Sequence, residues 1–130
     1  LVFYFVIDLN RRGINIRKLI SSVENTIINT LKEFNIKVFA DRKNVGIWHK
    51  RKVDNKIKIE KIAAIGIRVK KWIAYHGFAL NISNNLDAYA KIIPCGINDK
   101  EITNLIKIKK QRYNYISDVL IEKFLKEIKN

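Results

Sequence analysis

The chain has 130 residues, the size of one domain, and its 48% hydrophobic residues can supply a single core. It carries 26 Lys and Arg against 12 Asp and Glu, a net charge of +14, which indicates a polyanionic partner such as nucleic acid, a membrane surface or an acidic protein. The one Cys excludes an intramolecular disulfide and a zinc site built from four cysteines, and suits a reducing, cytoplasmic compartment.

The composition also has a second explanation. Ile, Lys and Asn are abundant, as codon bias in an AT-rich genome produces without selection on charge, so a plain solvated basic surface is the alternative to a functional one. The absence of Met predicts that the chain is a piece of something longer or has been processed. No apolar run approaches the ~20 residues that span a bilayer, so no transmembrane helix is expected, and residues 1–7 lack the flanks of a signal peptide.

The first part of the chain predicts a strand, a helix and a hairpin. Residues 1–8 are aromatic and β-branched without clean alternation, which predicts a strand covered on both faces in the middle of a sheet. Asn15 is a predicted helix cap, and apolar residues at three- and four-residue spacing over 16–34 predict an amphipathic helix. Short strands at 37–40 and 45–49 are expected to form a hairpin.

The rest of the chain predicts further strands and a closing helix. Residues 50–58 carry the densest charge and are expected to form an exposed loop. Long strands at 59–69 and 72–82 then follow as antiparallel neighbours, and apolar spacing over 116–128 predicts an amphipathic helix. This order predicts one α+β domain over residues 1–130, built on a mostly antiparallel or mixed sheet with packed helices.

Cys95 is the candidate nucleophile. It lies between Pro94 and Gly96, whose backbone preferences predict a shaped loop in place of a helix or strand. A lone Cys is commonly an inert, buried side chain, whereas such a loop presents the sulfur beside backbone amides that can face a developing oxyanion. Both interpretations stay open. An ordinary thiol is only a few per cent ionised at neutral pH, so a nucleophilic Cys95 needs a neighbour that favours its thiolate.

Two basic residues are candidate activators of Cys95. His76 is compatible with a Cys–His pair and with a structural hydrogen bond inside a strand. Lys61 is the one basic residue in the apolar stretch 59–67, so its ammonium is expected to be buried or to face a cleft. The alternative for Lys61 is an edge-strand lysine that prevents aggregation.

Three motifs follow one another along the chain: KIAAIGIRV at 61–69, YHGFALN at 75–81 and IPCG at 93–96. In this order and spacing they resemble the lipoyl(octanoyl) transferase family, the octanoyl-[acyl carrier protein]:protein transferases of lipoate biosynthesis. LVFYFVIDLNRRG at 1–13 and VGIW at 45–48 resemble the same family. The resemblance implies the fold of the biotin and lipoate protein ligases, here truncated at the N-terminus.

The resemblance also implies a site and its partners. Cys95 would carry the octanoyl group as a thioester, and Lys61 would lower the pKa of that thiol. By motif position, the residues that would line the acyl site are Ala64, Ile65, Gly66, Gly77, Phe78 and Ala79. Acyl carrier protein would be the octanoyl donor, and lipoyl domains of 2-oxoacid dehydrogenases and the glycine cleavage H protein the acceptors. Neither step needs a metal or a cofactor, and neither nucleic acid nor a membrane is an implied partner.

The chain departs from the family before its first strand. Members carry an Arg-Gly-Gly segment and a Tyr-His-Gly-Pro-Gly-Gln segment there, and neither occurs in this sequence. We therefore expect the C-terminal portion of the catalytic domain, with poor transfer unless the upstream segment is restored. Two alternatives remain: an inactive fragment of the transferase, and a small basic nucleic-acid-binding module, which the charge favours but which lacks a helix-turn-helix, zinc or RNP signature.

Overall fold

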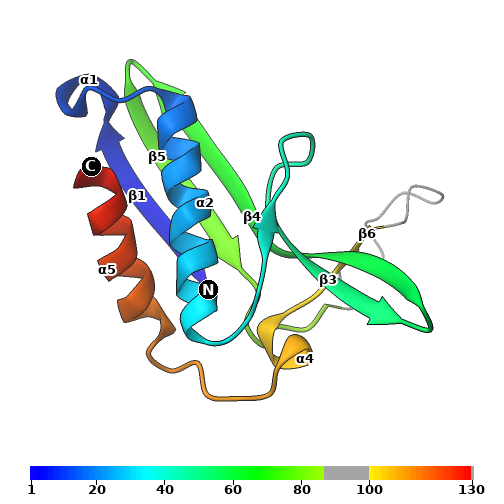
Figure 1. The fold of residues 1–130 in the computed structure, drawn as a ribbon. Helices are drawn as coiled ribbons and strands as arrows, with labels where there is room; N and C mark the ends of the chain where they lie inside the picture. The colour runs from blue at the N-terminus through cyan, green and yellow to red at the C-terminus, as the bar shows by residue number, and fades with distance from the viewer. Residues whose placement is uncertain (87–99, 130) are drawn as a thin grey trace.

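The computed structural model describes residues 1–86 and 100–129. Along the described residues a first strand is followed by two helices, a run of consecutive strands and two closing helices, as Figure 1 shows. They are β1 (Val2–Asp8), α1 (Leu9–Arg12), α2 (Ile16–Glu33), β2 (Phe39–Ala40), β3 (Ile47–Val53), β4 (Lys56–Lys70), β5 (Ile73–Leu80), β6 (Lys100–Ile102), α4 (Leu105–Ile108) and α5 (Ile116–Lys129).

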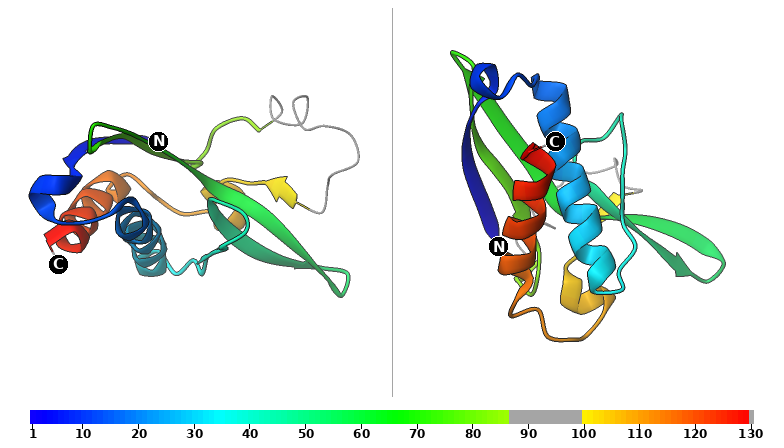
Figure 2. Two further views of the ribbon diagram at one scale, coloured as in Figure 1. Left: turned by 90° about the horizontal axis from the view of Figure 1, so that it is seen from above. Right: turned by 60° about the vertical axis from the view of Figure 1, so that its left-hand side comes forward.

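The strands form one mixed sheet in the order β1-β5-β4-β3-β2. Neighbours in that order are antiparallel, and β6 pairs with β4 in parallel. Helices α2 and α5 lie side by side on one face of the sheet (Figures 1 and 2). This confirms the predicted α+β class, the mixed sheet and the packed helices.

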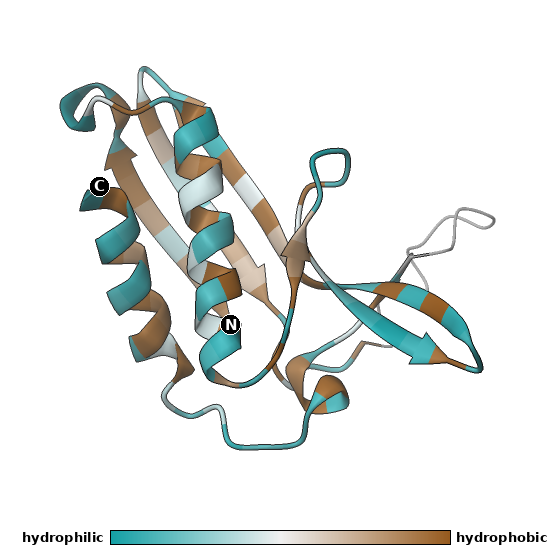
Figure 3. Cartoon of the chain, in the orientation of Figure 1, coloured by the Kyte–Doolittle hydropathy of each residue, from teal (hydrophilic) through white to brown (hydrophobic). Residues whose placement is uncertain are grey.

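The two long helices form where the apolar spacing predicts them. The side chain of Asn15 caps α2 by accepting a hydrogen bond from the backbone N–H of Lys18 at 2.8 Å. Both helices alternate hydrophilic and hydrophobic stripes (Figure 3). The buried apolar residues of the two helices are Leu19, Val23, Ile27 and Leu31 on α2, and Ile116, Leu120, Phe124 and Ile128 on α5.

Strand β1 lies at the edge of the sheet, so the prediction that it is central was wrong. Among the described strands it pairs only with β5. Phe5 and Ile7 face the helices and are buried, whereas Val2, Tyr4 and Val6 are 61, 72 and 75% exposed. Apolar residues on both faces of β1 suggested that both faces are covered. The sequence of the strand does not show which neighbouring elements cover them.

The charged stretch 50–58 is a β-hairpin, so the predicted loop was wrong. Strand β3 continues to Val53, β4 begins at Lys56, and the two residues between them, Asp54 and Asn55, have φ of 49° and 65°. Two successive left-handed residues form the tight turn that suits a hairpin's twist. The charges are compatible with strands because the hairpin projects from the body of the sheet (Figure 2), and its charged residues between 50 and 58 are exposed to water.

Candidate active site

Lys61 lies inside the sheet and not at its edge. It is opposite Trp48 of β3 on one side and Ile102 of β6 on the other, and its carbonyl accepts a hydrogen bond from the N–H of Thr103 at 2.9 Å. The edge-strand interpretation of this lysine is therefore wrong. Its side chain is half-buried, and its Nζ atom lies 5.3 Å from the centre of the Trp48 ring. A cation over an indole face is attracted to the ring's electron density.

Gly46 and Trp48 fix the place of the Lys61 side chain. A Cβ atom at Gly46 would lie 2.7 Å from Cε of Lys61 and 2.9 Å from the carbonyl oxygen of Ala63, so the lysine runs along bare backbone. Trp48 is only 6% exposed, and its Nε1–H donates to the carbonyl of Asn44 at 3.0 Å. The ammonium thus rests on a fixed aromatic ring.

The neighbouring acid points away from Lys61. Glu60 is 4% exposed and accepts hydrogen bonds from Arg51 at 2.7 Å and His49 at 3.4 Å on the opposite face of the strand. Successive strand residues alternate between faces, which separates Glu60 from Lys61. Within residues 1–86 and 100–129, no carboxylate forms an ion pair with Lys61. Its positive charge can therefore act on an anion on its own face.

The six residues expected around an acyl group come together as three successive cross-strand pairs. The pairs between β4 and β5 are Ala64 with Ala79, Ile65 with Phe78, and Gly66 with Gly77. The middle pair faces the helices: Phe78 is 3% exposed and stacks on Phe3 with ring centres 4.8 Å apart. The alanine and glycine pairs face the other way, so small residues form the open face and large ones support it from beneath.

Gly77 allows β1 to approach β5. Its φ is +156°, and a Cβ atom there would lie 2.1 Å from the carbonyl oxygen of Phe3, which leaves no room for a side chain. His76, the other candidate activator, has a φ of 71° within β5. Its ring is exposed and lies against Tyr4 and Tyr75, with ring centres 5.8 and 4.7 Å away.

Cys95 and its loop 93–96 fall outside the described residues. The pairing of this thiol with Lys61 or His76 therefore stays a prediction. The described residues show a half-buried lysine ammonium beside a tryptophan ring and, further along β4, cross-strand pairs of alanines and glycines with β5.

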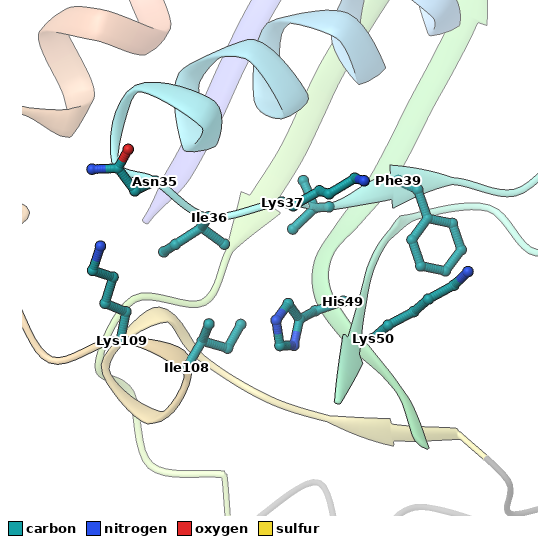
Figure 4. A pocket seen from close by; sticks show the side chains of 9 residues that line it. Asn35, Ile36, Lys37, Phe39, His49, Lys50, Ile108 and Lys109 are labelled. Carbon is teal, nitrogen blue, oxygen red and sulfur yellow. The ribbon is translucent and has the colours of Figure 1, made fainter. Parts of the chain in front are cut away.

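A separate cavity lies between the end of α2, strand β3 and α4. It measures about 400 Å³, and His49 points into it between Ile36 and Ile108 (Figure 4). Its lining residues are Asn35, Ile36, Lys37, Val38, Phe39, His49, Lys50, Ile108 and Lys109. None of them was predicted as a site residue, because they come from three distant parts of the chain and share no motif.

None of the helices in residues 1–86 and 100–129 combines the length and the apolar character that crossing a bilayer requires. These residues also hold no group of three or more His, Cys, Asp or Glu side chains placed to bind a metal ion.

Comparison by sequence gives a family and named relatives. The family model of the lipoyl protein ligase A/B catalytic domain matches residues 1–129. An octanoyltransferase of Wolbachia pipientis subsp. Culex pipiens is 42% identical over 127 residues, 96% of this chain and 60% of that protein. An octanoyltransferase of Paracoccus denitrificans is 38% identical over 110 residues, 81% of this chain and 50% of that protein. The chain thus spans 50 to 60% of the length of these relatives.

Comparison by structure gives the fold. Apo biotin protein ligase from Aquifex aeolicus superposes with a TM-score of 0.70 at 17% identity, over 98% of this chain and 52% of that one. Lipoate-protein ligase A bound with ATP superposes with a TM-score of 0.64 at 14% identity, over 88% of this chain and 47% of that one. The predicted likeness to the biotin and lipoate protein ligase fold is confirmed.

Proposed function

The chain belongs to the lipoyl protein ligase A/B catalytic domain family, and we propose that it is the catalytic part of an octanoyltransferase of lipoate biosynthesis. The observation that carries this proposal is its 38 to 42% identity with proteins named octanoyltransferase over most of the chain. In this proposal the donor is octanoyl-acyl carrier protein and the acceptor is a lysine of a lipoyl domain. The reducing cytoplasm, which keeps Cys95 as a thiol, is the proposed compartment.

The proposed reaction has two steps. The Cys95 thiolate attacks the donor's thioester carbonyl, the bond from carbon to the carrier's sulfur breaks, and the carrier leaves as a thiol after taking up a proton. The neutral amine of the acceptor lysine then attacks the octanoyl-Cys95 thioester. An amide forms, the amine loses a proton, and the Cys95 thiolate is regenerated. The covalent intermediate divides one difficult transfer into two easier steps.

Lys61 is proposed to favour the thiolate of Cys95. Its support is the half-buried ammonium beside Trp48 with no described carboxylate paired to it. Lowering a thiol pKa by two units takes about 2.7 kcal/mol. An ammonium about 4 Å away supplies about 4 kcal/mol at an effective dielectric constant near 20, which is sufficient.

The open floor on β4 and β5 is proposed to receive the octanoyl chain. Ala64 and Gly66 are exposed, and their partners on β5 are also Ala and Gly. Because these side chains are small, a linear alkyl chain can lie close to the backbone where larger residues would exclude it. Ile65 and Phe78 would act from beneath, by keeping the two strands firmly packed on the helices.

Mass spectrometry of the acylated protein tests the proposal. The chain is incubated with octanoyl-acyl carrier protein, and its intact mass is measured before and after hydroxylamine, which cleaves thioesters. We expect one octanoyl adduct that hydroxylamine removes and that is absent from Cys95→Ser. A folded wild-type chain that gains no adduct would favour the inactive fragment. A hydroxylamine-sensitive adduct on Cys95→Ser would reject Cys95 as the nucleophile.

A further inference from the structure

The projecting β3–β4 hairpin has two chemically different faces. Residues directly opposite each other in an antiparallel pair share a face. One face, the ion-paired face, carries the pairs His49 with Glu60, Arg51 with Lys58, and Val53 with Lys56. The other, the lysine face, carries the pairs Trp48 with Lys61, Lys50 with Ile59, and Lys52 with Ile57.

The ion-paired face neutralises its own cations. Arg51 bonds to buried Glu60 at 2.7 Å and to Glu101 of β6 at 3.3 Å. Lys58 bonds to the same Glu101 at 3.3 Å. Two carboxylates from neighbouring strands thus balance the two central cations of this face, and they leave little charge there for a partner.

The lysine face keeps its charge. None of the ion pairs formed within residues 1–86 and 100–129 includes Lys50, Lys52 or Lys61. Two of these ammonium groups lie over aromatic rings, Lys50 over Phe39 and Lys61 over Trp48, each at 5.3 Å. A ring attracts a cation without cancelling its charge. The hairpin's positive charge is therefore concentrated on one face.

Apolar side chains alternate with these lysines. Ile57 is 67% exposed beside Lys52, and half-buried Ile59 lies beside Lys50. A partner that places carboxylates against the lysines can therefore place apolar side chains against the isoleucines. Such a pattern is typical of an acidic amphipathic protein surface, in which charge guides the encounter and apolar contact adds affinity.

We propose that the lysine face docks an acidic carrier protein, the acyl donor of the proposed function, on which this inference rests. The face runs without a break from the hairpin's turn to Lys61, so a carrier bound there lies next to the candidate site. Nucleic acid fits less well, because single strands bind by stacking bases on open aromatic rings. On this face Trp48 is 6% exposed and the Phe39 ring lies beneath Lys50.

Binding of octanoyl-acyl carrier protein to the whole chain tests this surface, with the dissociation constant measured by calorimetry at low and high salt. Lys52→Glu is compared with Lys56→Glu, the same charge change on the same hairpin but on the ion-paired face. We expect Lys52→Glu to weaken binding about tenfold or more and Lys56→Glu about threefold or less. Ile57→Ser, which changes no charge, should weaken binding in both salts. Circular dichroism checks that all three variants fold.

The inference is overturned by any of three results: no binding by the wild-type chain, equal loss at positions 52 and 56, or tighter binding of a single-stranded oligonucleotide with the same pattern among the variants. A second measurement separates this from the proposed function. Octanoyl-pantetheine, which carries no protein, should acylate wild type and Lys52→Glu equally. If octanoyl-pantetheine acylates neither the wild type nor Lys52→Glu while the carrier protein still binds as expected, the proposed function fails and the docking surface stands.

Discussion

Gly46 determines how closely the Lys61 side chain can approach the sheet. The glycine has a φ of +134°, which L side chains rarely adopt, and its missing Cβ leaves the space that Cε of Lys61 occupies. Gly66 lies five residues beyond Lys61 on the same strand and does not have such a φ. No atom lies within 4 Å of the position that its Cβ would take. Glycine is therefore sterically required at position 46 but not at position 66.

We expect Gly46→Ala to lower the free energy of unfolding by about 1–3 kcal/mol, because the new methyl group meets the Ala63 carbonyl and the backbone is strained. Gly66→Ala should change it by less than about 1 kcal/mol, in the stabilising direction, because an alanine restricts the unfolded chain more than a glycine does. Urea unfolding of both variants measures this. Equal destabilisation would contradict the difference in space.

If Lys61 acts on Cys95 as proposed, Lys61→Ala should raise the pKa of the Cys95 thiol, because loss of the proposed neighbouring cation disfavours the thiolate. Less thiolate at neutral pH means slower alkylation by iodoacetamide, by about tenfold for each unit of the shift. Lys61→Arg keeps the charge and should keep most of the rate. The measurement is the alkylation rate from pH 6 to 9, and an unchanged profile in Lys61→Ala would leave Lys61 with a packing role only.

The sequence identified Lys61 but not its partners. Its apolar neighbours indicate a lysine within a strand, and the structure places it inside β4 with a half-buried side chain. The approach of Gly46 and Trp48 depends on the register between β3 and β4, which shifts between Ile47 and Trp48. A shift of one residue moves every later side chain to the other face, so local sequence alone does not determine such a contact.

Strands and helices differ in how far their environment could be predicted. Helix α2 follows from its cap and its spacing, because both signals lie within the helix itself. The hairpin at 50–58 could not be predicted from its local sequence, because ion pairs between different strands stabilise it. Among them are Arg51 with Glu60 and Lys58 with Glu101 of β6. Strand β6 was not predicted, since three residues pairing with a distant strand carry no periodic signal.

Asn15→Ala should destabilise the protein by about 1 kcal/mol, because the Lys18 N–H loses its side-chain acceptor. Asn15→Asp keeps a capping oxygen at the same place and should have little effect. Thermal unfolding of the two variants checks this at constant pH. A loss in Asn15→Asp as large as in Asn15→Ala would show that the cap does not stabilise α2.

At the scale of the whole molecule, the two long helices cover one face of the sheet, and within residues 1–86 and 100–129 no helix packs on the other. Val2, Tyr4 and Val6 of β1 are exposed on that second face, opposite Ala79, Gly77 and Tyr75 of β5. Exposed apolar patches of this kind mark interaction sites or favour association. Strand β1 adds an unpaired edge among the described strands, which a second chain can extend.

Val6→Lys should therefore reduce self-association, because it places a charge among the exposed apolar side chains of the edge strand β1. Val45→Lys is the control: Val45 is also exposed, at 58%, but lies away from β1, before β3. Light scattering over a concentration series should show a lower average mass for Val6→Lys than for wild type and Val45→Lys. Identical scattering by all three proteins would mean that this face does not mediate association.

The place of β1 beside β5 also determines when the strand can fold. Synthesis reaches Val2 long before its partner Ala79, and the ribosome adds about 5–20 residues per second, so β1 waits about 4–16 s for β5. Strands β3, β4 and β5 follow one another as hairpins and can pair as they emerge. Among the described strand pairs, β1 and β5 thus form the pair whose first strand waits longest for its partner, so the apolar side chains of β1 are the ones that a nascent-chain chaperone would shield.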